Sequence, residues 1–297
     1  MQTKKKKENP NIIVIGELII DEHTYSKMIG TSLETPTLKS QFRSKKITMG
    51  GAGKVFTALQ GINKNNYFIT ILGSDKKKIR FSYDKKIIKF FHKGKSIIKK
   101  RYWIDNYKIL QINSDNNRTI LNIKNIQKKI LRILEKYKKC KAIIISDYMH
   151  GMFDPFFTKQ IINFAKINNI VTYVDQQASK NNSNLYLYKG FDYLIINENE
   201  LNIFFSNNDE LKKNIKKLNM LLEIPNIVIK LSSKGCIGFH NNKFYRVAAY
   251  KKIYQPLDTS GAGDYFLAKF VSSKQKNFNK RLLESNKFSY EYISNYF

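Results

Sequence analysis

The sequence predicts an α/β fold in which a doubly wound, mostly parallel sheet is flanked by helices. Short apolar runs rich in β-branched residues alternate with longer amphipathic stretches, the pattern typical of parallel strands joined by helices. Two segments, about 22–48 and 96–113, do not follow this alternation. We expect them to form a small β lid over the carboxyl edge of the sheet, where ligands bind in such folds.

The expected elements follow one another along the chain in strand and helix order. Strands of the sheet are expected at residues 12–15, 67–72, 142–145, 170–174, 193–196 and 226–231. Helices are expected at residues 52–62, 126–138, 156–168, 198–205 and 209–222. Within the lid, residues 97–104 and 107–112 are expected to pair around an Asp105-Asn106 turn.

Length and composition indicate one globular unit. With 297 residues the chain can bury a large core, and we expect a single domain over residues 11–297 after a disordered, Lys-rich leader at residues 1–10. The leader is not followed by an apolar run long enough for a secretion signal, and no membrane span is expected, so we expect a cytoplasmic enzyme. Cys140 and Cys236 are too few for a disulfide framework and are expected to be buried thiols.

The charge of the chain is strongly positive. Lys and Arg total 53 against 23 Asp and Glu, a formal net charge of +30. Such a charge favours nucleic acid or another anion as a partner. The lysines are spread over every segment, however, and no finger, basic-zipper or RNA-binding signature is present. We therefore do not expect nucleic acid as a partner, a hypothesis that would need a contiguous basic face, and favour small phosphorylated molecules.

The most informative motif is the stretch Asp258-Thr259-Ser260-Gly261-Ala262-Gly263-Asp264, which leads into an apolar, helix-like segment. Its glycines allow a tight turn, so that the amides of Gly261, Ala262 and Gly263 can point into one concavity at a helix start, where a phosphate would bind. Asp264 would then be placed to accept a proton from an attacking hydroxyl. Taken alone, such a string is also a common helix-entry turn.

Other polar residues directly follow expected strands, where ligands would bind. Asp21 and Gly50-Gly51 come after the first strand and before the first helix, although a turn cap and a tight turn would explain them equally well. Asn197 and Glu200 follow the fifth strand and could be a capping box, a ligand pair, or both.

Taken in order, these motifs resemble those of the ribokinase-like carbohydrate kinases, the phosphofructokinase B family. The match comprises Gly16-Glu17 with a later Asp21, Gly50-Gly51 before a helix, the Asn197-x-x-Glu200 element, the strand and turn up to Gly235, and the motif that ends at Asp264. No P-loop sequence occurs. Within the family, the chain most resembles the heptose 7-phosphate kinase type. This resemblance rests on Ser146-Asp147-Tyr148 and Lys99-Lys100-Arg101.

The resemblance implies ATP-dependent phosphorylation of a sugar or sugar phosphate with Mg²⁺, including a heptose phosphate used for nucleotide-sugar or lipopolysaccharide precursors. It implies Asp264 as base, with Gly261, Ala262 and Gly263 stabilising the transferred phosphoryl group, and Glu200 organising the metal. The residues that it implies in substrate binding are Asp21, Gly50, Gly51, Lys54, Lys100 and Arg101. The residues that it implies in ATP binding are Asn197, Lys230, Ser232, Gly235, Gly261, Gly263 and Asn286. A homodimer through the lid is the expected assembly.

The chain departs from the family pattern at several positions. Lys54 stands where the family usually has Asn, Lys230 where it has Thr and Ser232 where it has Gly. The segment 73–91, normally a turn and a helix, is shortened, and only 33 residues follow Asp264. These departures support a competing hypothesis, a degenerate kinase-fold protein that binds ligands or acts as a scaffold without turnover.

Overall fold

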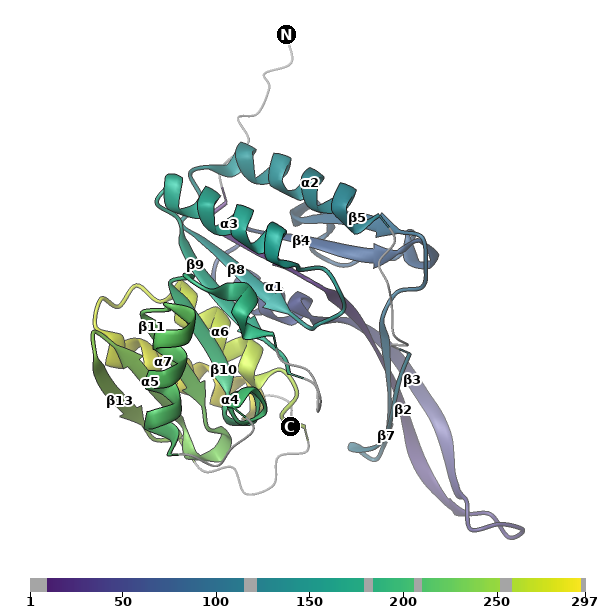
Figure 1. The fold of residues 1–297 in the computed structure, drawn as a ribbon. Helices are drawn as coiled ribbons and strands as arrows, with labels where there is room; N and C mark the ends of the chain where they lie inside the picture. The colour runs from purple at the N-terminus through teal and green to yellow at the C-terminus, as the bar shows by residue number, and fades with distance from the viewer. Residues whose placement is uncertain (1–9, 115–121, 179–183, 206–209, 252–257, 295–297) are drawn as a thin grey trace.

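The computed structural model describes residues 10–114, 122–178, 184–205, 210–251 and 258–294. Within these ranges its main body is a nine-stranded sheet with the order β13-β12-β11-β10-β9-β8-β1-β4-β5 (Figure 1). The strands from β11 to β5 in this order are parallel, and β12 and β13 form an antiparallel hairpin at one edge. The expected doubly wound, mostly parallel sheet is confirmed. The Lys-rich leader falls, apart from its last residue, outside the described residues.

The strands of this sheet include all six that were expected, with ends that agree within two residues. They are β1 Ile12–Gly16, β4 Asn66–Gly73, β5 Ile87–His92, β8 Ala142–Asp147, β9 Val171–Gln176, β10 Tyr193–Asn197, β11 Asn226–Lys230, β12 Cys236–His240 and β13 Lys243–Val247. β5 lies in the segment interpreted as a shortened turn and helix. It is an edge strand with several half-buried residues, so its sequence lacks the apolar run of a central strand.

Seven α-helices lie in the described ranges. They are α1 Ala52–Ile62, α2 Ile123–Leu134, α3 Pro155–Ile167, α4 Glu198–Phe205, α5 Leu211–Leu222, α6 Ala262–Ser272 and α7 Phe278–Ser294. Short 3₁₀ turns occur at Ser74–Lys76, Asp84–Lys86, Glu135–Tyr137, Leu185–Tyr188 and Ser232–Lys234. Among these helices none has both the length and the apolar composition needed to cross a bilayer.

Helices cover both faces of the sheet, and the alternation of side chains along each strand divides the core into two clusters. In β1, Ile13 and Ile15 pack into the cluster formed with α2, α3 and α5, whereas Ile12 and Val14 pack into the cluster formed with α1, α6 and α7. Burial on both faces explains why the central strands are continuous apolar runs. Cys140 and Cys236 are buried free thiols, as expected.

The lid is a four-stranded sheet with the order β3-β2-β6-β7. Its strands are β2 Leu18–Thr31, β3 Leu38–Gly51, β6 Ile98–Ile104 and β7 Tyr107–Asn113. Asp105 and Asn106 both have positive φ, 46° and 70°, which is the geometry of the tight hairpin turn expected there. β2 and β3 extend well beyond the main body (Figure 1), while their inner ends join β1 and α1 at the carboxyl edge of the sheet.

Candidate active site

The motif at residues 258–264 forms the turn that opens α6. Gly261 has φ 103°, a conformation that favours glycine, and precedes the first helical residue. The amide of Ala262 donates to the Thr259 carbonyl at 3.1 Å. This bond engages the Ala262 amide within the turn and corrects the expectation that it points freely into the concavity. The amides of Gly261 and Gly263 remain the candidates for an anion at this helix N-terminus.

Asp264 lies half-buried in the first turn of α6. The hydroxyl of Tyr148, just after β8, donates a hydrogen bond to its Oδ1 at 3.1 Å. Burial, and then the nearby carboxylate of Asp175, raise the pKa of Asp264 to about 6, although Lys54 and Lys230 act in the opposite direction. A position at the start of a helix favours the charged form of a carboxylate, but desolvation has the larger effect on the pKa of Asp264. Asp264 is still mostly ionised at neutral pH.

A cavity of about 920 Å³ opens beside Asp264, between the turn of α6 and the carboxyl ends of β9, β10 and β11. Its walls include the 3₁₀ turn after β11 and the exposed side of α7. The residues expected on the nucleotide side all line it: Asn197, Lys230, Ser232, Gly235, Gly261, Gly263 and Asn286. This volume falls in the range of pockets for drug-sized ligands.

Asn197 and Glu200 form a reciprocal capping box at the start of α4. The Asn197 amide donates to Glu200 Oε2 at 2.7 Å, and the Glu200 amide donates to Asn197 Oδ1 at 2.9 Å. Both residues also line the cavity, so the structural and the ligand-binding interpretations are compatible. Burial is the main cause that raises the pKa of Glu200 to about 7, with Lys230 acting in the opposite direction.

The cavity wall carries a buried ion pair that the sequence did not suggest. Asp175, the fifth residue of β9, accepts a hydrogen bond from Lys230 Nζ at 3.0 Å. The described residues contain no group of three or more His, Cys, Asp and Glu arranged to hold a metal ion. Glu200 and Asp175 both line the cavity, and two carboxylates of this kind would suit a hard cation that keeps several waters.

On the other side of Asp264, Asp21 of β2 lies beneath the lid, buried between two cations. Its Oδ1 lies 2.5 Å from Arg101 Nη1 of β6, and its Oδ2 lies 3.5 Å from Lys54 Nζ of α1. Gly50 is required here because a Cβ at that position would lie within 2.7 Å of the Asp21 carboxylate. Gly51 lies beside it as the N-cap of α1.

Lys54 connects this cluster to the turn of α6. Its Nζ donates to the Ser260 carbonyl at 3.4 Å, in addition to its ion pair with Asp21. The same ammonium acts on the pKa of Asp264. The lid contacts this turn directly, because Lys108 Nζ of β7 lies 3.1 Å from Asp258 Oδ1. The lid and the turn of α6 are therefore joined by an ion pair.

Lys100 does not belong to this cluster, contrary to the sequence-based expectation. Successive side chains of a strand point to opposite faces, and in β6 Arg101 is buried toward Asp21 while Lys100 is exposed. Lys99, its neighbour on the other side, has its Nζ 6.0 Å from the ring centroid of Tyr148. Lys99 and Arg101 are thus the basic side chains of β6 that face the site.

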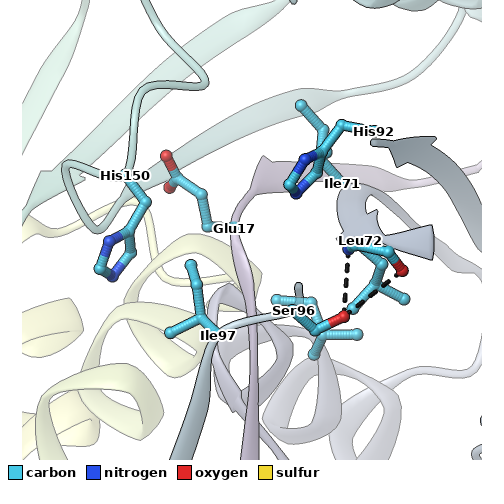
Figure 2. A pocket seen from close by; sticks show the side chains of 9 residues that line it. Glu17, Ile71, Leu72, His92, Ser96, Ile97 and His150 are labelled. Atoms are coloured by element: carbon cyan, nitrogen blue, oxygen red, sulfur yellow. Dashed lines mark hydrogen bonds between the residues drawn. The ribbon is translucent and has the colours of Figure 1, made fainter. Parts of the chain in front are cut away.

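Glu17 supports the loop that carries Tyr148. Its two carboxylate oxygens accept hydrogen bonds from the amides of Tyr148 and Met152, at 3.0 Å and 3.2 Å. Burial, and then the neighbouring Asp147, raise the pKa of Glu17 to about 8. Figure 2 shows Glu17 with His92 and His150 around a second cavity of about 20 Å³, which has room for a water-sized molecule and not for a sugar.

Comparison of the chain with known proteins identifies its family. The model of the pfkB family carbohydrate kinases matches residues 9–290. The chain belongs to the pfkB family. Two curated pfkB relatives are both named "Bifunctional protein HldE". The one from Campylobacter jejuni strain RM1221 is 28% identical over 88% of this chain, and the one from Aliarcobacter butzleri strain RM4018 is 27% identical over 94%. The chain spans 56% and 60% of the length of these relatives.

Solved structures of pfkB-type kinases share the fold. Escherichia coli phosphofructokinase-2 in complex with fructose-6-phosphate superposes with a TM-score of 0.69 at 14% identity, covering 97% of this chain and 100% of that one. Arabidopsis thaliana ribokinase complexed with ribose and ATP superposes with a TM-score of 0.64 at 15% identity, covering 95% of this chain and 92% of that one. These likenesses show a ribokinase-like fold for this pfkB chain.

Proposed function

We propose that the chain transfers a phosphoryl group from ATP to a hydroxyl of a sugar phosphate, with Asp264 as the general base. The observation that carries this proposal is the position of Asp264, which lines the 920 Å³ cavity and interacts with Lys54, a member of the cluster around Asp21. A hydroxyl bound near Asp21 and a phosphate bound at the start of α6 would meet at this carboxylate.

In this mechanism Asp264 accepts the proton of the attacking hydroxyl through the oxygen that Tyr148 does not occupy. A pKa of about 6 keeps the group ionised at neutral pH while leaving it more basic than an ordinary Asp. The amides of Gly261 and Gly263 stabilise the charge on the transferred phosphoryl group. Glu200 and Asp175 would hold Mg²⁺ on this side of the cavity. When bound, the ion would neutralise charge on the phosphates.

An anionic substrate follows from the charges beneath the lid. Lys54 and Arg101 contribute two positive charges against the single carboxylate of Asp21, and Lys99 adds a third cation nearby. A neutral sugar would leave this excess uncompensated, whereas a sugar phosphate would bind it by charge-assisted hydrogen bonds. A heptose phosphate in nucleotide-sugar or lipopolysaccharide precursor synthesis is the substrate we propose, which the relatives named HldE support.

One observation favours a second candidate, a ligand-binding or scaffold protein without turnover. Oδ1 of Asp21 lies 2.5 Å from Arg101 Nη1, so a sugar hydroxyl would have to compete with a buried cation for this carboxylate. On the first proposal, the substrate phosphate attracts Arg101 and frees the carboxylate. The two candidates therefore differ in whether any sugar phosphate is turned over.

We also propose a homodimer through the lid. Large apolar side chains on the lid strands are exposed in the single chain: Ile29, Leu38, Phe42, Ile47, Ile109, Leu110 and Ile112. Exposed apolar side chains on three strands of one small sheet support an interface between copies. Use of ATP as donor supports a cytoplasmic location.

A screen of sugar phosphates with Mg-ATP tests the proposed function. The chain should release ADP in the presence of at least one sugar phosphate, heptose 7-phosphate included, and the same compound should raise the melting temperature. Neutral sugars of matched structure provide the control. Ligands that raise the melting temperature without any ADP release would favour the protein without turnover.

A further inference from the structure

A lysine ammonium lies within the cluster of carboxylates on the nucleotide side. Lys230 is the last residue of β11, its side chain is only 16% exposed, and its Nζ lies 3.0 Å from Asp175 Oδ1. Asp175, Glu200 and Asp264 each raise the pKa of Lys230, in that order, and outweigh the effect of burial. Lys230 therefore remains charged in the free protein.

The ammonium also lies against the turn of α6. A Cβ on Gly263 would be 3.2 Å from Lys230 Nζ, so the ammonium lies close against this turn. Lys230 and Gly263 both line the 920 Å³ cavity, with Glu200 on the same wall. Lys230 thus faces both the carboxylates and the helix N-terminus where a phosphate would bind.

We propose that Lys230 is a protein-borne cation that contacts the phosphates of the bound nucleotide and performs part of the charge neutralisation otherwise left to Mg²⁺. This inference rests on the proposed function, since it needs a nucleotide in the large cavity. The carboxylates alone would repel a nucleotide that carries no metal. With the ammonium between them and the turn of α6, the chain binds nucleoside diphosphate without Mg²⁺.

A purely structural role for Lys230 makes a different prediction. In that case the ion pair with Asp175 only ties β9 to β11 across β10, and loss of either partner should have similar consequences. On our proposal the two losses have opposite signs, because removal of Asp175 leaves a freer cation, whereas removal of Lys230 leaves uncompensated carboxylates next to the phosphates.

Calorimetric titration with ADP, in EDTA and in excess Mg²⁺, tests this proposal without catalysis. Wild type should bind ADP in EDTA, and Lys230→Met should weaken that metal-free binding at least tenfold, with a smaller loss in Mg²⁺. Asp175→Asn should keep or improve the metal-free affinity. Lys269→Met, the same charge removed from the far end of α6, should change neither affinity by more than about twofold.

Lys230→Arg keeps the charge and should retain metal-free binding even if Lys230→Met melts too early for titration. The proposal is overturned if Lys230→Met binds ADP in EDTA as tightly as wild type, or if Lys230→Arg loses metal-free binding although it keeps the charge. It is also overturned if Asp175→Asn and Lys230→Met lose affinity equally. Failure of the proposed function itself is distinct, because it would appear as the absence of ADP release in the presence of sugar phosphates, which this titration does not measure.

Discussion

The hydroxyl of Tyr148 donates a hydrogen bond to Oδ1 of Asp264 across 3.1 Å, joining two residues that are 116 positions apart in the sequence. Burial and the neighbouring Asp264 raise the pKa of Tyr148 well above its ordinary value, so the phenol stays protonated and acts as the donor. Glu17, between β1 and β2, holds the backbone amide of Tyr148 in place. Tyr148 is thus a positioning residue that orients the carboxylate and leaves its other oxygen for a substrate.

Removal of this hydrogen bond should shift the pH dependence of turnover. The bond lowers the pKa of Asp264, whose net value of about 6 is raised above that of an ordinary Asp mainly by burial. Since the base works when deprotonated, kcat of wild type should fall as the pH falls through about 6. In Tyr148→Phe that fall should begin at higher pH because the pKa of Asp264 rises further. An acid limb unchanged between the two proteins would show that Tyr148 does not set this pKa.

Asp264→Asn should reduce kcat by about 10²–10⁴-fold, the usual contribution of general-base catalysis. The amide keeps the size of the side chain but cannot accept the proton. Because Asp264 lies beside the phosphate site rather than in the adenine-side turn, ADP affinity measured by calorimetry should change far less. Turnover retained within a few-fold would contradict the proposed mechanism.

Gly263→Val should weaken ATP binding at least tenfold. A Cβ at Gly263 would lie 3.2 Å from Lys230 Nζ, and the valine methyl groups would fill the space in front of the helix-entry amides. Gly61→Val is a matched control, because a Cβ at Gly61 in α1 meets no atom within 4 Å. Asp21→Ala, on the sugar side, should also leave ATP affinity nearly intact. Equal ATP affinity in Gly263→Val and wild type would remove the anion-binding role of this turn.

Lys54→Asn should weaken the binding of sugar phosphates more than that of neutral sugars. Lys54 and Arg101 together exceed the charge of Asp21, so an anionic substrate loses more attraction than a neutral one when Lys54 is replaced. Competition or thermal-shift titrations with matched pairs of sugar and sugar phosphate measure this difference. The same loss for both members of a pair would mean that Lys54 does not recognise charge. Lys100→Asn, at an exposed position on the lid, is the control.

Much of the fold was predictable because both faces of the sheet are buried. Strands such as β8 and β11 must then be continuous apolar runs, and helices such as α1 must present an apolar face, so their positions can be read within about two residues. The edge strand β5 was not predicted because an edge position relaxes this requirement. Lys100 was placed in the site because a run of three basic residues does not show which of them faces inward.

The family resemblance pointed to residues that line the 920 Å³ cavity. The sequence by itself determined the α/β class, the lid and the turn at residues 258–264. These depend on local patterns, such as apolar periodicity and glycine spacing, that any copy of the sequence displays. Only the tertiary structure decided how the charges are paired. The contacts of Tyr148 with Asp264, of Lys230 with Asp175 and of Arg101 with Asp21 join distant segments. Burial at those contacts, which no local pattern reports, sets the protonation of the groups that would carry out the chemistry.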